Sequence, residues 1–238
     1  MRSPCILKAG DKLSTLDAVE GDYEDWLAAG LGLARRQVDV IAVHRGAQLP
    51  ALDETAAVVI TGSAAMVSDR LPWMLAAERW LAAAVARSIP VLGVCFGHQL
   101  LAQALGGRVG YNPRGVEVGT VQVRLTAAAA SHPLFAGLPE CFPAQLSHRQ
   151  TVLTLPPGAT VLAASAGDDH QAFAVGSCAV GVQFHPEFDE AIVRAYARHY
   201  TARLQEEGKD ATGVMAGIAP SPEAFGLLRR FARWAGIA

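Results

Sequence analysis

The sequence contains few cysteines, and no two of them are close enough to form a C-x-x-C pair. The four cysteines, Cys5, Cys95, Cys141 and Cys178, are spread over 238 residues. This spacing excludes a zinc ribbon or finger and does not suggest the disulfide framework of a small secreted protein. We therefore expect no metal site, and we expect a reducing, cytoplasmic location in which a lone thiol stays reactive.

Long apolar runs are also missing, although 51% of the residues are hydrophobic. Polar residues or glycines interrupt every apolar run before it is long enough to span a bilayer. The apolar stretch near the N-terminus is too short for a secretory signal. These absences exclude an integral membrane protein, while the apolar content still allows a large buried core.

Clusters of basic residues and a phosphate-binding loop are likewise absent. The chain has 20 Lys and Arg against 22 Asp and Glu, a formal charge of −2, and the basic residues are scattered. This balance argues against nucleic acid as the main partner. No GxxxxGK(S/T) loop is found, and nothing in the sequence predicts a cofactor. We expect a small-molecule substrate instead.

The pattern that is present predicts an α/β fold. Apolar strands alternate with helical patterns in the first half, which is typical of an open, mostly parallel sheet with helices on both faces. The expected strands there are 5–8, 38–43, 56–60 and 89–94, and the expected helices are 22–30, 73–88 and a third that begins after Cys95 and ends at Gly106.

The second half is richer in short strands, expected at 116–125, 142–146, 161–164, 172–175 and 179–184. We expect them to form a small β-rich part that is partly antiparallel. Helical patterns follow at 190–207 and 221–234, and the Gly- and Pro-containing segment 209–222 is predicted to be mobile. One domain over 1–238 is expected, with a core to about residue 200 and a helical extension over 201–238.

The most informative residue is Cys95, which stands between Gly93 and Gly97 at the junction of a strand and a helix. This spacing matches the nucleophile elbow, G-x-nucleophile-x-G, with Cys in the nucleophile position. The glycines allow strand and helix to approach closely, and the helix N-terminus favours a thiolate. Most free cysteines are merely buried, but this setting predicts a reactive one.

A second motif, His185-Pro186-Glu187, closes another apolar strand. Residues two apart in an extended segment point the same way, and Pro186 holds that geometry. The carboxyl ends of strands gather catalytic groups in open α/β sheets. Cys95, His185 and Glu187 are therefore predicted as nucleophile, base and orienting carboxylate.

Such a nucleophile needs donors for the oxyanion that its attack creates. The turn Thr61-Gly62-Ser63, after the third strand, can supply backbone N–H groups. The amide of Phe96, next to the nucleophile, can supply another. Gly62, Ser63 and Phe96 are the predicted oxyanion hole.

Taken together, these motifs resemble those of class I glutamine amidotransferases, of the type that includes the glutaminase portion of GMP synthase. The elbow and the His-Pro-Glu segment, about 90 residues apart, are highly specific in combination. The resemblance is carried by residues 59–63 (VITGS), 93–99 (GVCFGHQ), 146–148 (LSH), 171–173 (QAF) and 181–187 (GVQFHPE).

The resemblance implies a flavodoxin-like fold and hydrolysis of the side-chain amide of glutamine. In that family a cysteine attacks the amide, ammonia leaves, and water releases glutamate from a γ-glutamyl thioester. By resemblance, Gln99 holds the substrate glutamine, and Ser147 and His148 contact its amino-acid end. The ammonia would pass to a separate synthetase subunit, since the chain resembles a free-standing amidotransferase.

Three positions depart from the family pattern. Ser63 stands where many relatives have a second Gly, Arg149 where GMP synthases commonly have Gly, and Gln150 where they commonly have Asp. The last two put the pocket for the amino-acid end in question. The main alternative is therefore a γ-glutamyl peptide hydrolase with the same thioester chemistry. A non-catalytic regulatory subunit is disfavoured by the complete Cys-His-Glu set, and a redox or chaperone protein by the His-Pro-Glu segment.

Overall fold

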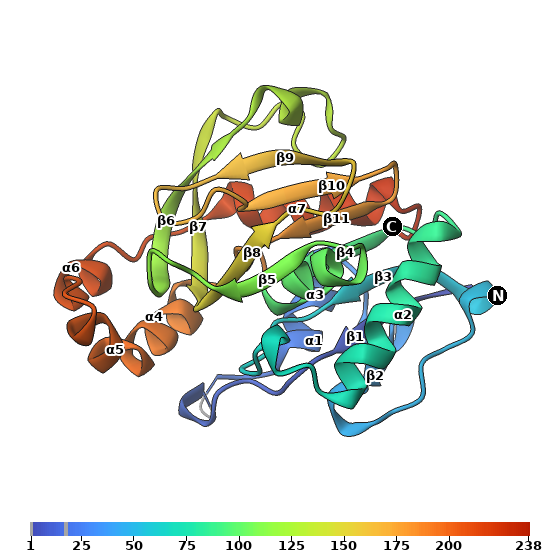
Figure 1. Cartoon of the computed structure of the whole chain (residues 1–238), viewed down its shortest axis with the longest axis horizontal. Coiled ribbons are helices and arrows are strands. Elements are labelled where there is room, and N and C mark those ends of the chain that lie inside the picture. The colour runs from blue at the N-terminus through green and yellow to red at the C-terminus, as the bar shows by residue number, and fades with distance from the viewer. Residues whose placement is uncertain (1, 17–18) are drawn as a thin grey trace.

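The computed structural model describes residues 2–16 and 19–238, and a nine-stranded sheet runs through the described chain (Figure 1). The order of its strands is β2-β1-β3-β4-β11-β10-β9-β6-β7, and β5 and β8 form a separate pair. The strands are β1 Ser3–Lys8, β2 Asp39–Ala42, β3 Thr55–Ile60, β4 Val91–Val94, β5 Arg108–Tyr111, β6 Glu117–Leu125, β7 Cys141–His148, β8 Gln150–Thr154, β9 Ala159–Ala164, β10 Ala172–Val175 and β11 Ala179–Val182.

The sheet is parallel in one half and antiparallel in the other. Strands β2, β1, β3, β4 and β11 run parallel, as predicted from their alternation with helices. Strands β10, β9, β6 and β7 continue the sheet by antiparallel pairing. The predicted β-rich part is therefore mostly an extension of the main sheet, and β5 and β8 form the small separate piece.

Helices cover both faces of this sheet (Figure 1). In β1 the side chain of Ile6 packs on the side of α1 and α7, whereas Leu7 packs on the side of α2 and α3, as the two-residue period of a strand requires. Near the β6–β7 edge lie α4, α5 and α6. The helices are α1 Tyr23–Leu31, α2 Pro72–Ala86, α3 Phe96–Ala104, α4 Glu190–His199, α5 Thr201–Glu206, α6 Ala211–Ala216 and α7 Pro222–Trp234.

Three local expectations differ from the structure. The helix expected over 190–207 is divided into α4 and α5 at Tyr200. No helix was predicted between 207 and 221, but the segment 209–222 contains α6, which Asp210 caps by accepting a hydrogen bond from Gly213 N, and the mobility of this segment stays a prediction. Strands β5 and β8 were not predicted; β8 starts only one residue after β7 ends, so Arg149 stands at a tight corner.

Within the described residues, no helix combines the length and the apolar character that crossing a membrane requires. Whether residues 1–238 form one domain stays a prediction.

Strand β4 and helix α3 pack at backbone contact distance. A Cβ added to Gly93 would lie 2.6 Å from the carbonyl carbon of Gly97, and one added to Gly97 would lie 2.7 Å from Ile60 Cβ. Only glycine allows this approach at both positions. The spacing between the elbow glycines is therefore a steric requirement of the fold.

Gly93→Ala is expected to lower the free energy of unfolding by about 1–3 kcal/mol or more, because the new methyl group meets backbone that has no room to move. Gly226→Ala in α7 is the matched control, since a Cβ there meets no atom within 4 Å. The control should stabilise the protein by roughly 0.5–1 kcal/mol through the higher helix propensity of alanine. Urea unfolding of both variants measures the difference, and equal effects would contradict the steric explanation.

Candidate active site

Cys95 occupies a strained turn between β4 and α3. Its φ of 50° and ψ of −102° lie where a side chain is rarely tolerated. Its backbone N–H still donates to Val182 O at 2.9 Å, so the turn is anchored to the neighbouring strand β11. The thiol is buried and points toward Ser147 O, with Sγ and O 3.7 Å apart. The predicted elbow geometry is therefore present in the structure.

The end of β11 brings His185 and Glu187 to this turn. His185 Nδ1 and Glu187 Oε1 are 2.7 Å apart, and both side chains are buried. Burial disfavours the charged imidazole. The negative charge of Glu187 and the nearby Cys95 sulfur, with hydrogen bonds to both side chains, outweigh burial and raise the pKa of His185 to about 10. The three predicted residues thus meet at the carboxyl ends of two adjacent strands, β4 and β11.

Aromatic rings hold the His185 imidazole in place. Phe188 stacks on it with ring centroids 3.8 Å apart and planes only 6° apart. Tyr23 and Tyr196 lie beyond, and their hydroxyl groups share a hydrogen bond. A Cβ added to Gly62 would lie 2.7 Å from His185 Cε1, so the position beside the ring requires glycine. Sequence patterns did not identify these aromatic residues: Tyr23 is distant in the chain, and Phe188, although close to His185, belongs to no motif.

The turn after β3 lies next to the elbow, as predicted. Ser63 Oγ donates to Ala9 O at 2.8 Å and accepts from Ala65 N at 3.1 Å, which ties the turn to the segment after β1. Ser63 and Phe96 both line the hollow beside Cys95. The N–H of Phe96 belongs to the first turn of α3, whose amides have no acceptor within the helix.

The hollow beside the thiol, here called the nucleophile pocket, has a volume of about 20 Å³. That is room for a single water molecule. Gln99 lines it, but both hydrogens of its amide are donated within the protein, to Gln150 O at 2.7 Å and to Gln183 Oε1 at 2.9 Å. Only Gln99 Oε1 is left for a ligand. The nucleophile pocket is lined by Ser63, Ala65, Met66, Cys95, Phe96, Gln99, Ser147, His148, Arg149, Gln150 and Tyr200.

His148 lies at the nucleophile pocket, but the protein engages both of its ring nitrogens. Nδ1 is 2.9 Å from Gln150 O, and Nε2 is 2.9 Å from Glu117 Oε2, which also accepts from Gln171 Nε2. Both partners are acceptors, so both nitrogens donate and the ring is an imidazolium. Burial opposes this charge, but the bond to Glu117 and its negative charge raise the pKa of His148. No ring nitrogen remains for substrate.

Glu117 is a largely buried polar residue at this site, with a side chain 10% exposed, that sequence reasoning missed. It starts β6, and burial alone would raise its pKa; hydrogen bonds and the charge of His148 lower it. No local pattern marks it, because its partner is 31 residues away in the chain. In the described parts of the chain, no group of three or more His, Cys, Asp or Glu side chains could hold a metal ion.

A family model described as glutamine amidotransferase class-I matches residues 17–194. The chain belongs to the class I glutamine amidotransferase family. Solved structures of this family share its fold. A glutamine amidotransferase from Thermotoga maritima aligns with a TM-score of 0.75 at 22% identity, over 99% of each chain. A glutamine amidotransferase from Methylobacillus flagellatus aligns with a TM-score of 0.69 at 25% identity, over 99% of this chain and 91% of that one. The predicted fold class is confirmed.

Two curated relatives share shorter stretches with this class I amidotransferase. The glutamine-hydrolyzing GMP synthase of Thermomicrobium roseum is 48% identical over 99 residues, which are 42% of this chain and 18% of that protein. Gamma-glutamyl peptidase 5 of Arabidopsis thaliana is 34% identical over 105 residues, 43% of this chain and 42% of that protein. The chain therefore matches less than half the length of either relative.

Replacing Glu187 with Gln should lower the pKa of His185, because the substitution removes the carboxylate charge beside the ring. Because the pKa of His185 is higher in the folded than in the unfolded protein, its protonation stabilises the fold. This stabilisation is fully present at a pH below the unfolded-state pKa of about 6.5, and it is lost as the pH rises towards 10. The wild type should therefore lose stability between about pH 7 and 10 more steeply than Glu187→Gln. NMR titration measures the pKa of His185 in both proteins. Urea unfolding across this pH range measures their stability. An unchanged His185 titration would contradict both expectations.

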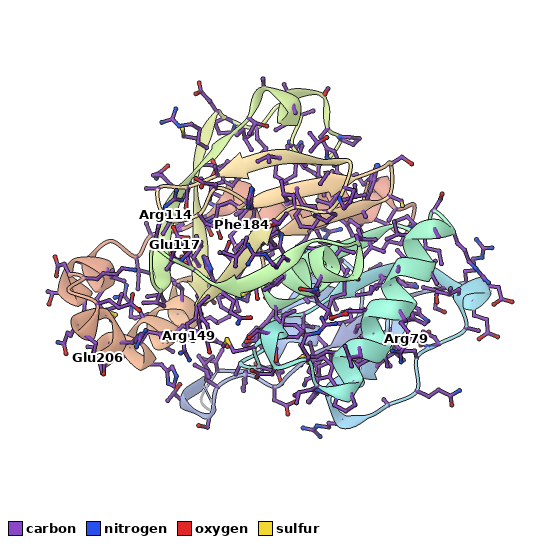
Figure 2. All side chains as sticks on the ribbon, viewed as in Figure 1. Arg79, Arg114, Glu117, Arg149, Phe184 and Glu206 are labelled. Atoms are coloured by element: carbon purple, nitrogen blue, oxygen red, sulfur yellow. The ribbon has the colours of Figure 1, made fainter. Side chains whose placement is uncertain are left out.

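Glu117→Ala should lower the free energy of unfolding by about 3–5 kcal/mol, because it leaves the His148 imidazolium buried without its counterion. Glu206→Ala on α5 is the control, since that carboxylate is 66% exposed and pairs only with Arg203. The control should change stability by less than about 0.5 kcal/mol. Figure 2 labels both glutamates. Chemical unfolding measures the free energy of unfolding of both variants. A loss in Glu117→Ala as small as that in Glu206→Ala would rule out a buried charged pair at His148.

Proposed function

We propose that the chain hydrolyses the side-chain amide of glutamine to glutamate and ammonia through a thioester on Cys95. One observation carries this proposal: Cys95 stands on a strained turn whose neighbouring strand ends in the hydrogen-bonded pair His185–Glu187. Membership of the class I family supports it. In this proposal Cys95 is the nucleophile, His185 the base and acid, and Glu187 the group that orients the imidazole.

In the first half of the reaction, His185 takes the proton of Cys95, the sulfur attacks the γ-carbonyl carbon as a thiolate, and a carbon–sulfur bond forms. The charge that develops on the oxygen is stabilised by backbone N–H groups of the Gly62–Ser63 turn and of Phe96. His185, charged beside Glu187, gives its proton to the leaving nitrogen. The carbon–nitrogen bond then breaks, and ammonia leaves a γ-glutamyl thioester on Cys95.

In the second half, water attacks the thioester carbon. His185, now neutral, takes a proton from the water, and the carbon–sulfur bond breaks to release glutamate. The proton returns to the Cys95 sulfur or stays on His185, which restores the starting pair. Glu187 stays ionised throughout and holds Nδ1–H in the orientation that exposes the other ring nitrogen to substrate.

We further propose that the ammonia is passed to a separate synthetase. The relatives that support this step are glutamine-hydrolyzing GMP synthases, and they match the chain over 18% and 25% of their own lengths. The matched stretches are thus at most a quarter of those proteins. The acceptor of the ammonia is therefore sought in another polypeptide or in sequence outside these residues.

The second candidate function is hydrolysis of a γ-glutamyl peptide, in which an amine replaces ammonia as the leaving group. The 34% identity with gamma-glutamyl peptidase 5 favours it, as does the replacement of the common family residues by Arg149 and Gln150. The thioester and the roles of Cys95, His185 and Glu187 are the same in both candidates. Only the leaving group differs.

Cys95→Ala should reduce glutamine hydrolysis by at least about a thousandfold, because no thioester can form without the sulfur. Cys141→Ala is the matched control, since Cys141 is exposed at the start of β7 and should keep full activity. Release of glutamate and ammonia from purified protein measures both. Activity that survives in Cys95→Ala would overturn the mechanism.

The same assay separates the two candidate functions. Values of kcat/KM for glutamine and for a γ-glutamyl dipeptide are compared in the wild type. A higher value for glutamine favours the amidotransferase, and a higher value for the dipeptide favours the peptide hydrolase. Loss of both activities in Cys95→Ala assigns them to one site.

A further inference from the structure

Arg149 stands out because its charge is not neutralised by its surroundings. It forms the corner between β7 and β8 and is half-buried. Its guanidinium lies over the Tyr111 ring, 5.5 Å from the ring centroid. Among the described residues it has no carboxylate or other hydrogen-bond partner, whereas Arg114 and Arg203 are each paired with an acidic side chain. Five N–H donors are therefore free to meet an anion.

Arg149 also lines two hollows at once. One is the nucleophile pocket, and the other is a cavity of about 270 Å³ that is also lined by Tyr111, Asn112 and Arg203, and by Glu207, which is paired with Arg203. Its side chain therefore stands where the small space beside Cys95 adjoins a larger one. Figure 2 shows Arg149 beside the α4–α5 helices, on the side facing the sheet. Cys95 and Arg149 thus line the same pocket.

The position of His185 decides which end of a substrate faces Arg149. Arg149 lines the nucleophile pocket beside Cys95, whereas His185 does not. The leaving nitrogen has to face His185 to receive its proton. Because the nucleophile pocket alone has room for a single water molecule, the acyl chain of the substrate has to extend past it, toward Arg149 and the cavity of about 270 Å³.

Gln150 does not offer its side chain to the substrate. Its Nε2 donates to Ser68 Oγ at 2.6 Å, and its Oε1 accepts from Ser68 N at 3.3 Å. By contrast Ser147 Oγ is buried at the pocket and has no hydrogen-bond partner among the described residues. Tyr200 lines the same space from the junction of α4 and α5. The groups left to bind the acyl end are thus mainly donors.

We propose that Arg149 is a specificity-determining residue that binds the α-carboxylate of a glutamyl substrate, with Ser147 as a second donor. The proposal rests on the proposed function, because it takes the γ-glutamyl group as the acyl part. A guanidinium and a carboxylate match in geometry and charge, and a half-buried setting strengthens their hydrogen bonds. The substrate class is therefore γ-glutamyl compounds with a free α-carboxylate.

Kinetics with glutamine and with its α-carboxamide, glutaminamide, test this assignment. Wild type should prefer glutamine by roughly tenfold to a hundredfold in kcat/KM, the value of a charge-assisted hydrogen bond. Arg149→Ala should lose this preference mainly through a higher KM, and Arg149→Lys should keep part of it. Arg79→Ala is the control, since Arg79 is exposed on α2, far from Arg149 in Figure 2. Undiminished preference in Arg149→Ala overturns the proposal.

A second measurement does not depend on turnover. Iodoacetate and iodoacetamide alkylate the Cys95 thiol with the same chemistry, but only iodoacetate is an anion. The ratio of their rates at Cys95 should fall several-fold in Arg149→Ala and stay unchanged in Arg79→Ala. If the wild type hydrolyses no γ-glutamyl compound, the proposed function fails, and this ratio alone decides whether Arg149 makes an anion site. An unchanged ratio in Arg149→Ala overturns it.

Discussion

The close approach of α3 to β4 is the constraint on which the rest of the site depends. Without side chains at Gly93 and Gly97, the first turn of the helix lies against backbone of the sheet. The chain can make that junction only by passing through the positive φ of Cys95, and this conformation directs the thiol out of the sheet. The neighbouring strand then delivers His185 at the height of the sulfur. A shift of α3 by one ångström would separate the two and remove the alignment that nucleophilic attack requires.

Buried polar contacts, more than apolar packing, shape the side of the site where the acyl group is proposed to bind. Gln150 O receives hydrogen bonds from both Gln99 and His148, and Glu117 supports the far side of the His148 ring. These hydrogen bonds hold Gln99, His148 and Gln150 in one arrangement. Ser147 Oγ lacks a partner among the described residues, as do Gln171 Oε1 and Gln183 Nε2, and Ser147 lines the pocket where a substrate is proposed to bind.

Local motifs made the elbow and the His-Pro-Glu segment predictable, because the spacing of Gly93, Cys95 and Gly97 and of His185 and Glu187 already specifies their geometry. The parallel half of the sheet followed from the alternation of apolar strands with helices. Glu117 was missed because its partner is distant in sequence, and β8 because nothing but Arg149 separates it from β7. Arg149 was visible as a departure from the family pattern, but only the fold shows that its charge is not paired. The catalytic and substrate-binding roles themselves stay predictions.

Strand β11 is the last strand of the chain, yet it lies near the centre of the sheet, between β4 and β10. During synthesis the Cys95 turn therefore emerges long before the strand that carries His185 and Glu187. Until β11 inserts, β4 is an open edge, and the thiol has neither its proposed base nor the Val182 carbonyl that anchors its backbone. Assembly of the catalytic centre and completion of the sheet are thus one event. A partly folded chain carries a thiol without the charged partner that would make it reactive, so the protein acquires its chemistry only when its fold is closed.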